Sequence, residues 1–192
     1  MGSQERFKLR PYQEEALAAV AEGRQRGLKR MVVCLPTGAG KTVIFSHLAA
    51  AAKRQVLVLA HREELLHQAR EKLDRAMEGR VRVDIEQGPL RASPEAQVVV
   101  CSIRSLRSER LAALLKGRDI ELVIYDECHH AVAEDNMRVL REMGAFDADW
   151  NGTLLGFTAT TMRGDGQGLE KVFEEIVYSQ SVLDLVDGGY LV

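Results

Sequence analysis

The sequence predicts an α/β fold, a doubly wound and mostly parallel sheet with helices on both faces, in a single domain of 192 residues. Two observations lead to this class. Short runs of β-branched and other apolar residues recur along the chain, which is typical of strands that are buried on both faces. Between them lie segments in which apolar residues recur at steps of three and four, which is typical of helices that cover a sheet.

The expected elements alternate along the chain. We expect strands at residues 31–34, 56–59, 98–101, 122–125 and 153–157. We expect helices at residues 11–26, 41–52, 62–77, 106–115 and 134–143. Weaker patterns predict further strands at residues 81–85 and 176–178 and a helix near residues 182–186. In folds of this class, ligands gather at the carboxyl ends of the strands, so functional motifs are expected there.

Composition narrows the class of protein. Hydrophobic residues make up 46% and charged residues 28%, a globular balance that excludes collagen-like and disordered chains. No apolar run approaches the roughly 20 residues that cross a bilayer, and the first residues lack a signal-peptide core, so we expect a cytoplasmic protein without a membrane partner. The net charge of −2 gives no bulk positive field for nucleic acid. The cysteines, Cys34, Cys101 and Cys128, lack metal-ligand spacing and are expected as buried free thiols.

A phosphate-binding loop follows the first expected strand directly. Its sequence is Leu35-Pro36-Thr37-Gly38-Ala39-Gly40-Lys41-Thr42, and a helical pattern starts at Lys41. The glycines let consecutive amides point inward, and the start of the helix adds positive potential for the β- and γ-phosphates of a nucleotide. Lys41 is expected to neutralise these phosphates and Thr42 to bind Mg²⁺. A glycine-rich turn that happens to precede a helix is the alternative, which the Gly-Lys-Thr ending disfavours.

A pair of carboxylates follows the fourth strong strand, in the segment Asp126-Glu127-Cys128-His129-His130. At this carboxyl end, Asp126 can hold Mg²⁺ and Glu127 can orient and deprotonate an attacking water. Alone, the pair would be read as a cap of the next element. Cys128, His129 and His130 also raise a zinc alternative, although adjacent residues rarely face one ion together and no second ligand cluster accompanies them.

Together these motifs resemble the first RecA-like motor domain of superfamily 2 helicases of the DExH type, in the branch of restriction motors and repair helicases. The general phosphate-loop pattern has glycine where this chain has Leu35, and the loop is similar to the helicase variant instead. The resemblance implies ATP and Mg²⁺ as cofactors. It also marks the segment Leu9-Arg10-Pro11-Tyr12-Gln13 as the adenine-recognition motif, with Gln13 on the adenine edge and Arg10 or Tyr12 packed nearby.

Further segments occur in the helicase order. The resemblance implies that His61 and Arg62, and then Ser102 in a second motif, contact the nucleic-acid backbone. A solvated first helical turn is the alternative for Arg62. The resemblance also implies that His129, Thr158 and Thr160 couple hydrolysis to movement along the strand. Thr161 stands where these relatives normally have proline, which loosens the backbone of that loop.

The resemblance covers nearly the whole chain, so we expect residues 1–192 to form the first, ATP-binding domain, with the second RecA-like domain of a full motor absent. The expected function is half of a nucleic-acid-dependent ATPase site that is weak in isolation. A nucleotide- or nucleic-acid-binding module without useful turnover is one alternative. A restriction-type motor that translocates on duplex DNA is another. Backbone-gripping motifs do not distinguish DNA from RNA.

Overall fold

A parallel sheet of seven strands forms the centre of the computed structural model, which describes residues 8–159 and 168–192. The strands are β1 (Arg30–Cys34), β2 (Gln55–Ala60), β3 (Val83–Glu86), β4 (Val98–Ser102), β5 (Ile120–Asp126), β6 (Thr153–Thr158) and β7 (Glu175–Ser179). Every expected strand is therefore confirmed, including the two weaker ones. Their boundaries differ from the expected ones by a few residues at most.

The strand order is β3-β4-β2-β5-β6-β1-β7, and all the neighbouring pairs are parallel. The chain leaves β1 and enters β2 on the far side of β5 and β6, so the order reverses between the two halves of the sheet. In doubly wound sheets the ligand crevice lies at such a reversal, outside the carboxyl ends of the strands.

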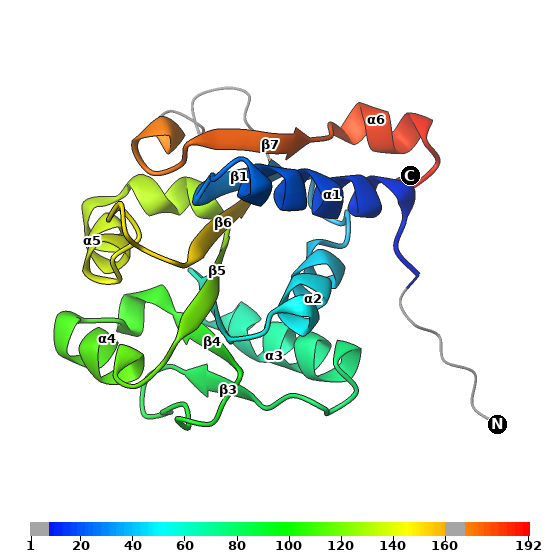
Figure 1. The fold of residues 1–192 in the computed structure, drawn as a ribbon. Coiled ribbons are helices and arrows are strands. Elements are labelled where there is room, and N and C mark those ends of the chain that lie inside the picture. Colours follow the sequence, from blue (N-terminus) through cyan, green and yellow to red (C-terminus); the bar gives the residue numbers. More distant parts are fainter. Residues whose placement is uncertain (1–7, 160–167) are drawn as a thin grey trace.

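Helices cover both faces of this sheet, as predicted. They are α1 (Pro11–Gln25), α2 (Lys41–Ala51), α3 (Glu64–Ala76), α4 (Ser108–Leu115), α5 (Glu134–Glu142) and α6 (Val182–Asp187). The buried side chains of α1, α2 and α3 belong to one hydrophobic cluster, and those of α4 and α5 belong to the other. Figure 1 shows α2 and α3 on one side of the central strands and α4 and α5 on the other.

Two helices begin later than the periodicity predicts. The short 3₁₀ helix η1 (Ile103–Ser105) follows β4, and α4 starts only at Ser108. Leu106 is fully buried, so its apolar character reflects the core packing of the connection rather than a helical face. Similarly, α3 begins at Glu64 and leaves Arg62 in the preceding turn.

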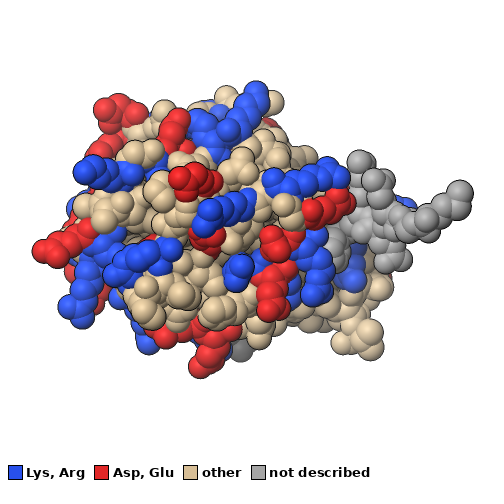
Figure 2. Space-filling view, turned by 90° about the horizontal axis from the view of Figure 1, so that it is seen from below, with Lys and Arg blue, Asp and Glu red and all other residues tan. Residues whose placement is uncertain are grey.

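The cysteines and the surface match their sequence predictions. Cys34, Cys101 and Cys128 are buried free thiols. Lysine and arginine side chains are interspersed with aspartate and glutamate on the face that Figure 2 shows, in agreement with the small net charge. Within the residues that the structure describes, no helix has the length and apolar character needed to cross a membrane.

Candidate active site

Most of the predicted site residues meet at one edge of the sheet, because the strands that carry them are parallel and adjacent. β4, β2, β5, β6 and β1 all end at this edge. The register places Ser102 opposite Ala60, Asp126 opposite Phe157, and Thr158 opposite Cys34. The loops that follow these residues therefore share one crevice, as the fold class predicts.

The phosphate loop between β1 and α2 depends on its glycines. Gly38 and Gly40 have φ values of +85° and +76°, in the left-handed region that side chains disfavour. A Cβ atom on Gly40 would also lie 2.6 Å from Gln13 Nε2. The loop is tied to the sheet where the Leu35 amide donates to the carbonyl oxygen of Thr158, at 2.9 Å. This geometry explains why alanine would not fit at Gly40.

The loop and the start of α2 fit an anion. Gly40, which precedes the helix, offers no side chain to cap it, and the first turn contains no acidic residue. The amides of Gly40, Lys41 and Thr42 donate to no acceptor within the described part of the chain. Free amides at a helix start carry partial positive charge and bind phosphate groups. Lys41 and Thr42 are half-buried in this turn, within reach of such a group.

Side chains of α1 hold the loop in this shape. The Tyr12 hydroxyl donates to the Ala39 carbonyl oxygen at 2.6 Å, and Gln13 Nε2 donates to the same oxygen at 3.2 Å. Gln13 Oε1 accepts the Arg10 amide at 2.9 Å. With only 3% of its surface exposed, Gln13 has both ends of its carboxamide bound to the backbone. The geometry assigns Gln13 to anchoring the loop, and its contact with adenine stays a prediction.

The C-terminal segment packs against the predicted adenine motif. Arg10 is exposed and donates to the Tyr190 carbonyl oxygen at 3.3 Å, and its guanidinium carbon lies 6.0 Å from the centre of the Tyr190 ring. Tyr190 and Tyr12 meet edge to face with ring centres 5.1 Å apart. We did not predict this contact from the sequence, because nothing local in the last residues indicates a partner near the start of the chain.

The carboxylates at the end of β5 lie in an unusual local environment. Burial raises the pKa of Asp126, an effect that the nearby Lys41 ammonium opposes. Asp126 Oδ1 accepts the Glu127 amide at 3.0 Å. Glu127 itself has φ 52° and ψ 53°, a left-handed backbone that is strained in a residue other than glycine. The structure thus brings Lys41, Asp126 and Glu127 into one electrostatic neighbourhood, and residues held this way cluster at functional sites.

Three histidines lie beside these carboxylates. His129 Nδ1 is 3.4 Å from the Thr158 hydroxyl, so the predicted coupling pair is in contact. His130 Nε2 is 3.8 Å from Glu127 Oε2. The His61 ring stacks on that of His130, with centres 4.0 Å apart and planes inclined by 17°. A continuous set of contacts therefore connects the end of β2 with the carboxylate of Glu127.

Of the predicted nucleic-acid contacts, two are accessible and one is not. His61 is half-buried and Arg62 is exposed, whereas Ser102 is fully buried and its hydroxyl has no partner among the described residues. The contact of Ser102 with a phosphate stays a prediction, on a side chain that is buried at the end of β4. Arg104 is exposed nearby, and its Nη2 lies 3.2 Å from His61 Nε2. No sequence pattern had predicted a role for Arg104.

Thr160, the second expected coupling hydroxyl, lies outside the described residues, as does Thr161. The zinc alternative with Cys128 is not supported, because that thiol is buried against Gly156 on the core side, where a Cβ on the glycine would lie 2.7 Å from Sγ.

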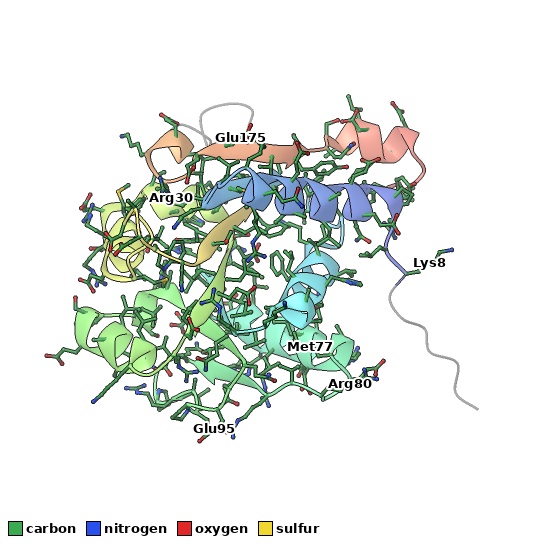
Figure 3. The ribbon with its side chains drawn as sticks, viewed as in Figure 1. Lys8, Arg30, Met77, Arg80, Glu95 and Glu175 are labelled. Atoms are coloured by element: carbon green, nitrogen blue, oxygen red, sulfur yellow. The ribbon has the colours of Figure 1, made fainter. Side chains whose placement is uncertain are left out.

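A cavity of ≈ 920 Å³ lies beside the phosphate loop, between α2 and the end of α3. Gly40 and Thr42 line one end of it. Met77 and Arg80, both labelled in Figure 3, line the other end. Asp126 is not among its lining residues. This groove thus approaches the phosphate loop from the side of α3 and is separate from the carboxylates.

Comparison with known proteins places these features in a family context. A family model described as "Type III restriction enzyme, res subunit" matches residues 6–163. The chain is 37% identical to a putative mitochondrial ATP-dependent helicase, irc3, of Schizosaccharomyces pombe. That match covers 97% of this chain and 31% of the relative, so the chain spans about a third of the relative's length.

Solved structures show the same architecture. The Pyrococcus furiosus Hef helicase domain superimposes with a TM-score of 0.70 and 25% identity, over 94% of this chain and 40% of that one. The Sulfolobus solfataricus SWI2/SNF2 ATPase core, solved in complex with dsDNA, gives a TM-score of 0.62 at 15% identity, over 84% and 34% of the two chains, a likeness of fold alone. The predicted RecA-like class is confirmed.

Proposed function

The chain belongs to the family described as type III restriction enzyme, res subunit, and we propose that it is the ATP- and Mg²⁺-binding half of a nucleic-acid-dependent motor ATPase. One observation carries this proposal. A helix start suited to anions, with Lys41, and the carboxylates of Asp126 and Glu127 meet at the same edge of a RecA-like sheet. Phosphoryl transfer needs positioning and charge stabilisation in this arrangement.

Each residue has a proposed role in hydrolysis. The loop Pro36-Thr37-Gly38-Ala39-Gly40 holds the phosphates through its backbone, and Lys41 neutralises the charge on the β- and γ-phosphates. Thr42 and Asp126 supply the oxygen atoms that Mg²⁺ prefers, and the ion, when bound, neutralises charge that develops on the phosphates. Glu127 orients a water and accepts its proton.

The histidines and Thr158 connect hydrolysis with nucleic acid in this proposal. His61 and Arg62 contact backbone phosphates, with Arg104 as an additional exposed cation beside them. His129, which contacts Thr158 in the structure, couples hydrolysis at the carboxylates to movement of the segment that begins at Thr158. The family resemblance gives Thr160 a role in the same coupling. So few phosphate contacts predict weak affinity for nucleic acid, with a salt dependence set by the small number of phosphates that are neutralised.

A partner domain completes the site in our proposal. A second RecA-like domain supplies arginine to the γ-phosphate across the crevice, and closure on nucleic acid brings it into place. The chain covers only 31% of the irc3 relative, which is consistent with a larger whole protein. We therefore propose that residues 1–192 bind ATP well and hydrolyse it slowly.

One further candidate function has a specific observation behind it. The matching family takes its description from restriction enzymes, which favours translocation on duplex DNA without strand separation as the use of the same chemistry. The choice between DNA and RNA, and between unwinding and translocation, leaves the roles of Lys41 and Glu127 unchanged. The cytoplasmic location stays a prediction, since one relative is named as mitochondrial.

Titration of the protein with a fluorescent adenine nucleotide, with and without Mg²⁺, tests the proposal. We expect saturable binding that Mg²⁺ strengthens, because Thr42 and Asp126 hold the ion against the phosphates. Competition with unlabelled ATP gives the affinity of the natural ligand. Absence of saturable, competable binding would show that the phosphate loop is a structural turn.

A further inference from the structure

The turn after β5 brings together three groups that bind transition metals. One ligand atom from each of Glu127, His129 and His130 lies within 4.8 Å of the other two. The zinc alternative predicted from the sequence has Cys128 as its third ligand, whereas the fold buries that thiol and turns the Glu127 carboxylate toward the histidines. The ligand set is therefore different from the one that the sequence suggested.

Local backbone geometry explains the convergence. Glu127 is followed by the 3₁₀ helix η2 (Cys128–Val132), and such helices have three residues per turn, so that side chains three apart lie above one another. This brings Glu127 Oε2 to 3.8 Å from His130 Nε2. Two ligands on one tetrahedral ion with bonds of about 2.0–2.1 Å lie roughly 3.3 Å apart, so a small side-chain movement closes the site.

Neighbouring contacts orient both imidazoles and leave ligand atoms available. Thr158 lies 3.4 Å from His129 Nδ1, which leaves Nε2 of that ring for an ion, and such outer contacts fix the tautomer of ligating histidines. The His61 ring covers a face of His130 and leaves its edge nitrogens uncovered. Asn136 Nδ2 donates to the His130 carbonyl oxygen at 2.8 Å and steadies the turn.

We propose that Glu127, His129 and His130 bind a divalent transition-metal ion of the zinc class, at a site separate from the Mg²⁺ site proposed at Thr42 and Asp126. Ligand chemistry distinguishes the two sites. Imidazole suits Zn²⁺, Co²⁺ and Ni²⁺, whereas Mg²⁺ takes oxygen ligands and rarely accepts nitrogen. Three protein ligands leave a fourth tetrahedral position for water, as in open zinc sites.

Occupation of this site has a consequence for activity. A carboxylate that is bound to a metal ion has its lone pair engaged, so Glu127 can no longer accept a proton from the attacking water. This consequence rests on the proposed function, while metal binding itself does not. Zinc-class ions should then inhibit hydrolysis without displacing ATP, because Lys41 and the loop amides are not involved.

Cobalt spectroscopy tests the site without relying on activity. The purified protein, free of nucleotide and Mg²⁺, is titrated with Co²⁺ at pH 7.5, and Zn²⁺ is then added in competition. We expect one equivalent of Co²⁺ with the visible bands of a four-coordinate nitrogen and oxygen site, no thiolate charge-transfer band, and full displacement by Zn²⁺. Six-coordinate spectra only, or a thiolate band, would contradict the proposal.

Variants separate this site from other histidines. His130→Gln and Glu127→Gln should each weaken Co²⁺ binding about tenfold or more, since even outer-contact losses reduce metal affinity 10–100-fold. His67→Gln removes an exposed histidine of α3 and should leave binding unchanged. Equal affinity in wild type and both site variants, or equal loss in His67→Gln, would overturn the proposal. Circular dichroism and ATP titration of the same variants report on folding and on the phosphate loop independently.

Discussion

The phosphate loop and the turn at residues 126–130, here called the acidic turn, lie at the same edge of the sheet. They differ in where the unfavourable backbone angles fall and in how their polar groups are satisfied. In the loop, positive φ angles fall on Gly38 and Gly40, and Tyr12 and Gln13 satisfy its carbonyl oxygens. In the acidic turn, a positive φ falls on Glu127. The buried hydroxyl of Tyr125, one residue before Asp126, and the buried Nδ1 of His61, stacked beside the turn, have no partner among the described residues.

This difference assigns nucleotide binding mainly to the loop and hydrolysis mainly to the acidic turn. In the loop, side chains of α1 bond to the Ala39 and Gly40 carbonyl oxygens, so contacts within the chain hold its shape. The acidic turn keeps a strained carboxylate and a buried one whose pKa is raised, which are features of sites where protons move. We infer that mutations in the loop act mainly on affinity, and that mutations in the turn act on turnover and relieve strain.

Lys41→Ala is expected to give the largest effect on the loop side. Hydrogen bonds to charged groups contribute about 1.5–3 kcal/mol, so its loss should weaken ATP binding by ~10- to 100-fold. Fluorescent nucleotide titration measures this. Lys116→Ala, an exposed change at the end of α4, serves as the control and should leave the affinity unchanged. Equal nucleotide affinity in wild type and Lys41→Ala would remove the loop from the site.

Gln13→Ala tests whether α1 anchors the loop. The substitution leaves the Ala39 and Gly40 carbonyl oxygens with fewer partners, so the free energy of unfolding should fall by about 1–3 kcal/mol. ATP and GTP binding should weaken alike, since the carboxamide is already bound to the backbone. Denaturant unfolding and nucleotide competition measure both, with the exposed Gln68→Ala as control. A loss confined to ATP would instead establish the adenine role that the sequence suggests.

Glu127→Asn tests whether the left-handed backbone of the acidic turn reduces the stability of the protein. Asparagine tolerates the left-handed backbone better than glutamate, so the free energy of unfolding should rise by up to about 1 kcal/mol. Hydrolysis should be lost, because the shortened amide cannot accept the proton. Asp135→Asn, at the exposed start of α5, is the matched change without strain. Destabilisation by Glu127→Asn would mean that the carboxylate contributes more to folding than its strain costs.

A smaller effect, on stability as a function of pH, is expected from the stacked pair His61 and His130. Burial together with Arg104 lowers the pKa of His61, and burial with the other two histidines lowers that of His130, while the Glu127 carboxylate opposes both shifts. With the folded pKa below the unfolded value of about 6.5, the unfolded chain binds more protons as pH falls. The resulting stability is present above pH ~6.5 and is lost as pH falls through the folded pKa.

Denaturant unfolding between pH 7.5 and 5 measures this loss. His61→Phe keeps a stacking ring without a titrating group and should flatten the pH dependence in that window. His67→Gln, an exposed change, should leave it as in wild type. The same slope in His61→Phe and wild type would show that the stack does not contribute.

The strands and the phosphate loop were predictable from local sequence patterns. Contacts between residues far apart in the chain were not. All strands and the phosphate loop follow from local patterns, because apolar runs and glycine spacing report on backbone geometry directly. The burial of Ser102 depends on packing between β4 and its neighbours, and no local signal marks it. The stack of His61 on His130 joins residues from the connections that follow two different strands, and the contact of Tyr190 with Tyr12 joins segments near the two ends of the chain.

Steady-state ATP turnover, with and without single-stranded nucleic acid, tests most directly whether this chain is half of a motor site. An arginine supplied by another domain typically contributes on the order of 10³ to 10⁵ in rate, so turnover by the chain alone should be very slow and stimulated little. Glu127→Gln serves as the control for contaminating ATPases, since it should bind ATP without hydrolysing it. Robust stimulated turnover that disappears in Glu127→Gln would contradict the account, because it would mean that residues 1–192 complete the site themselves.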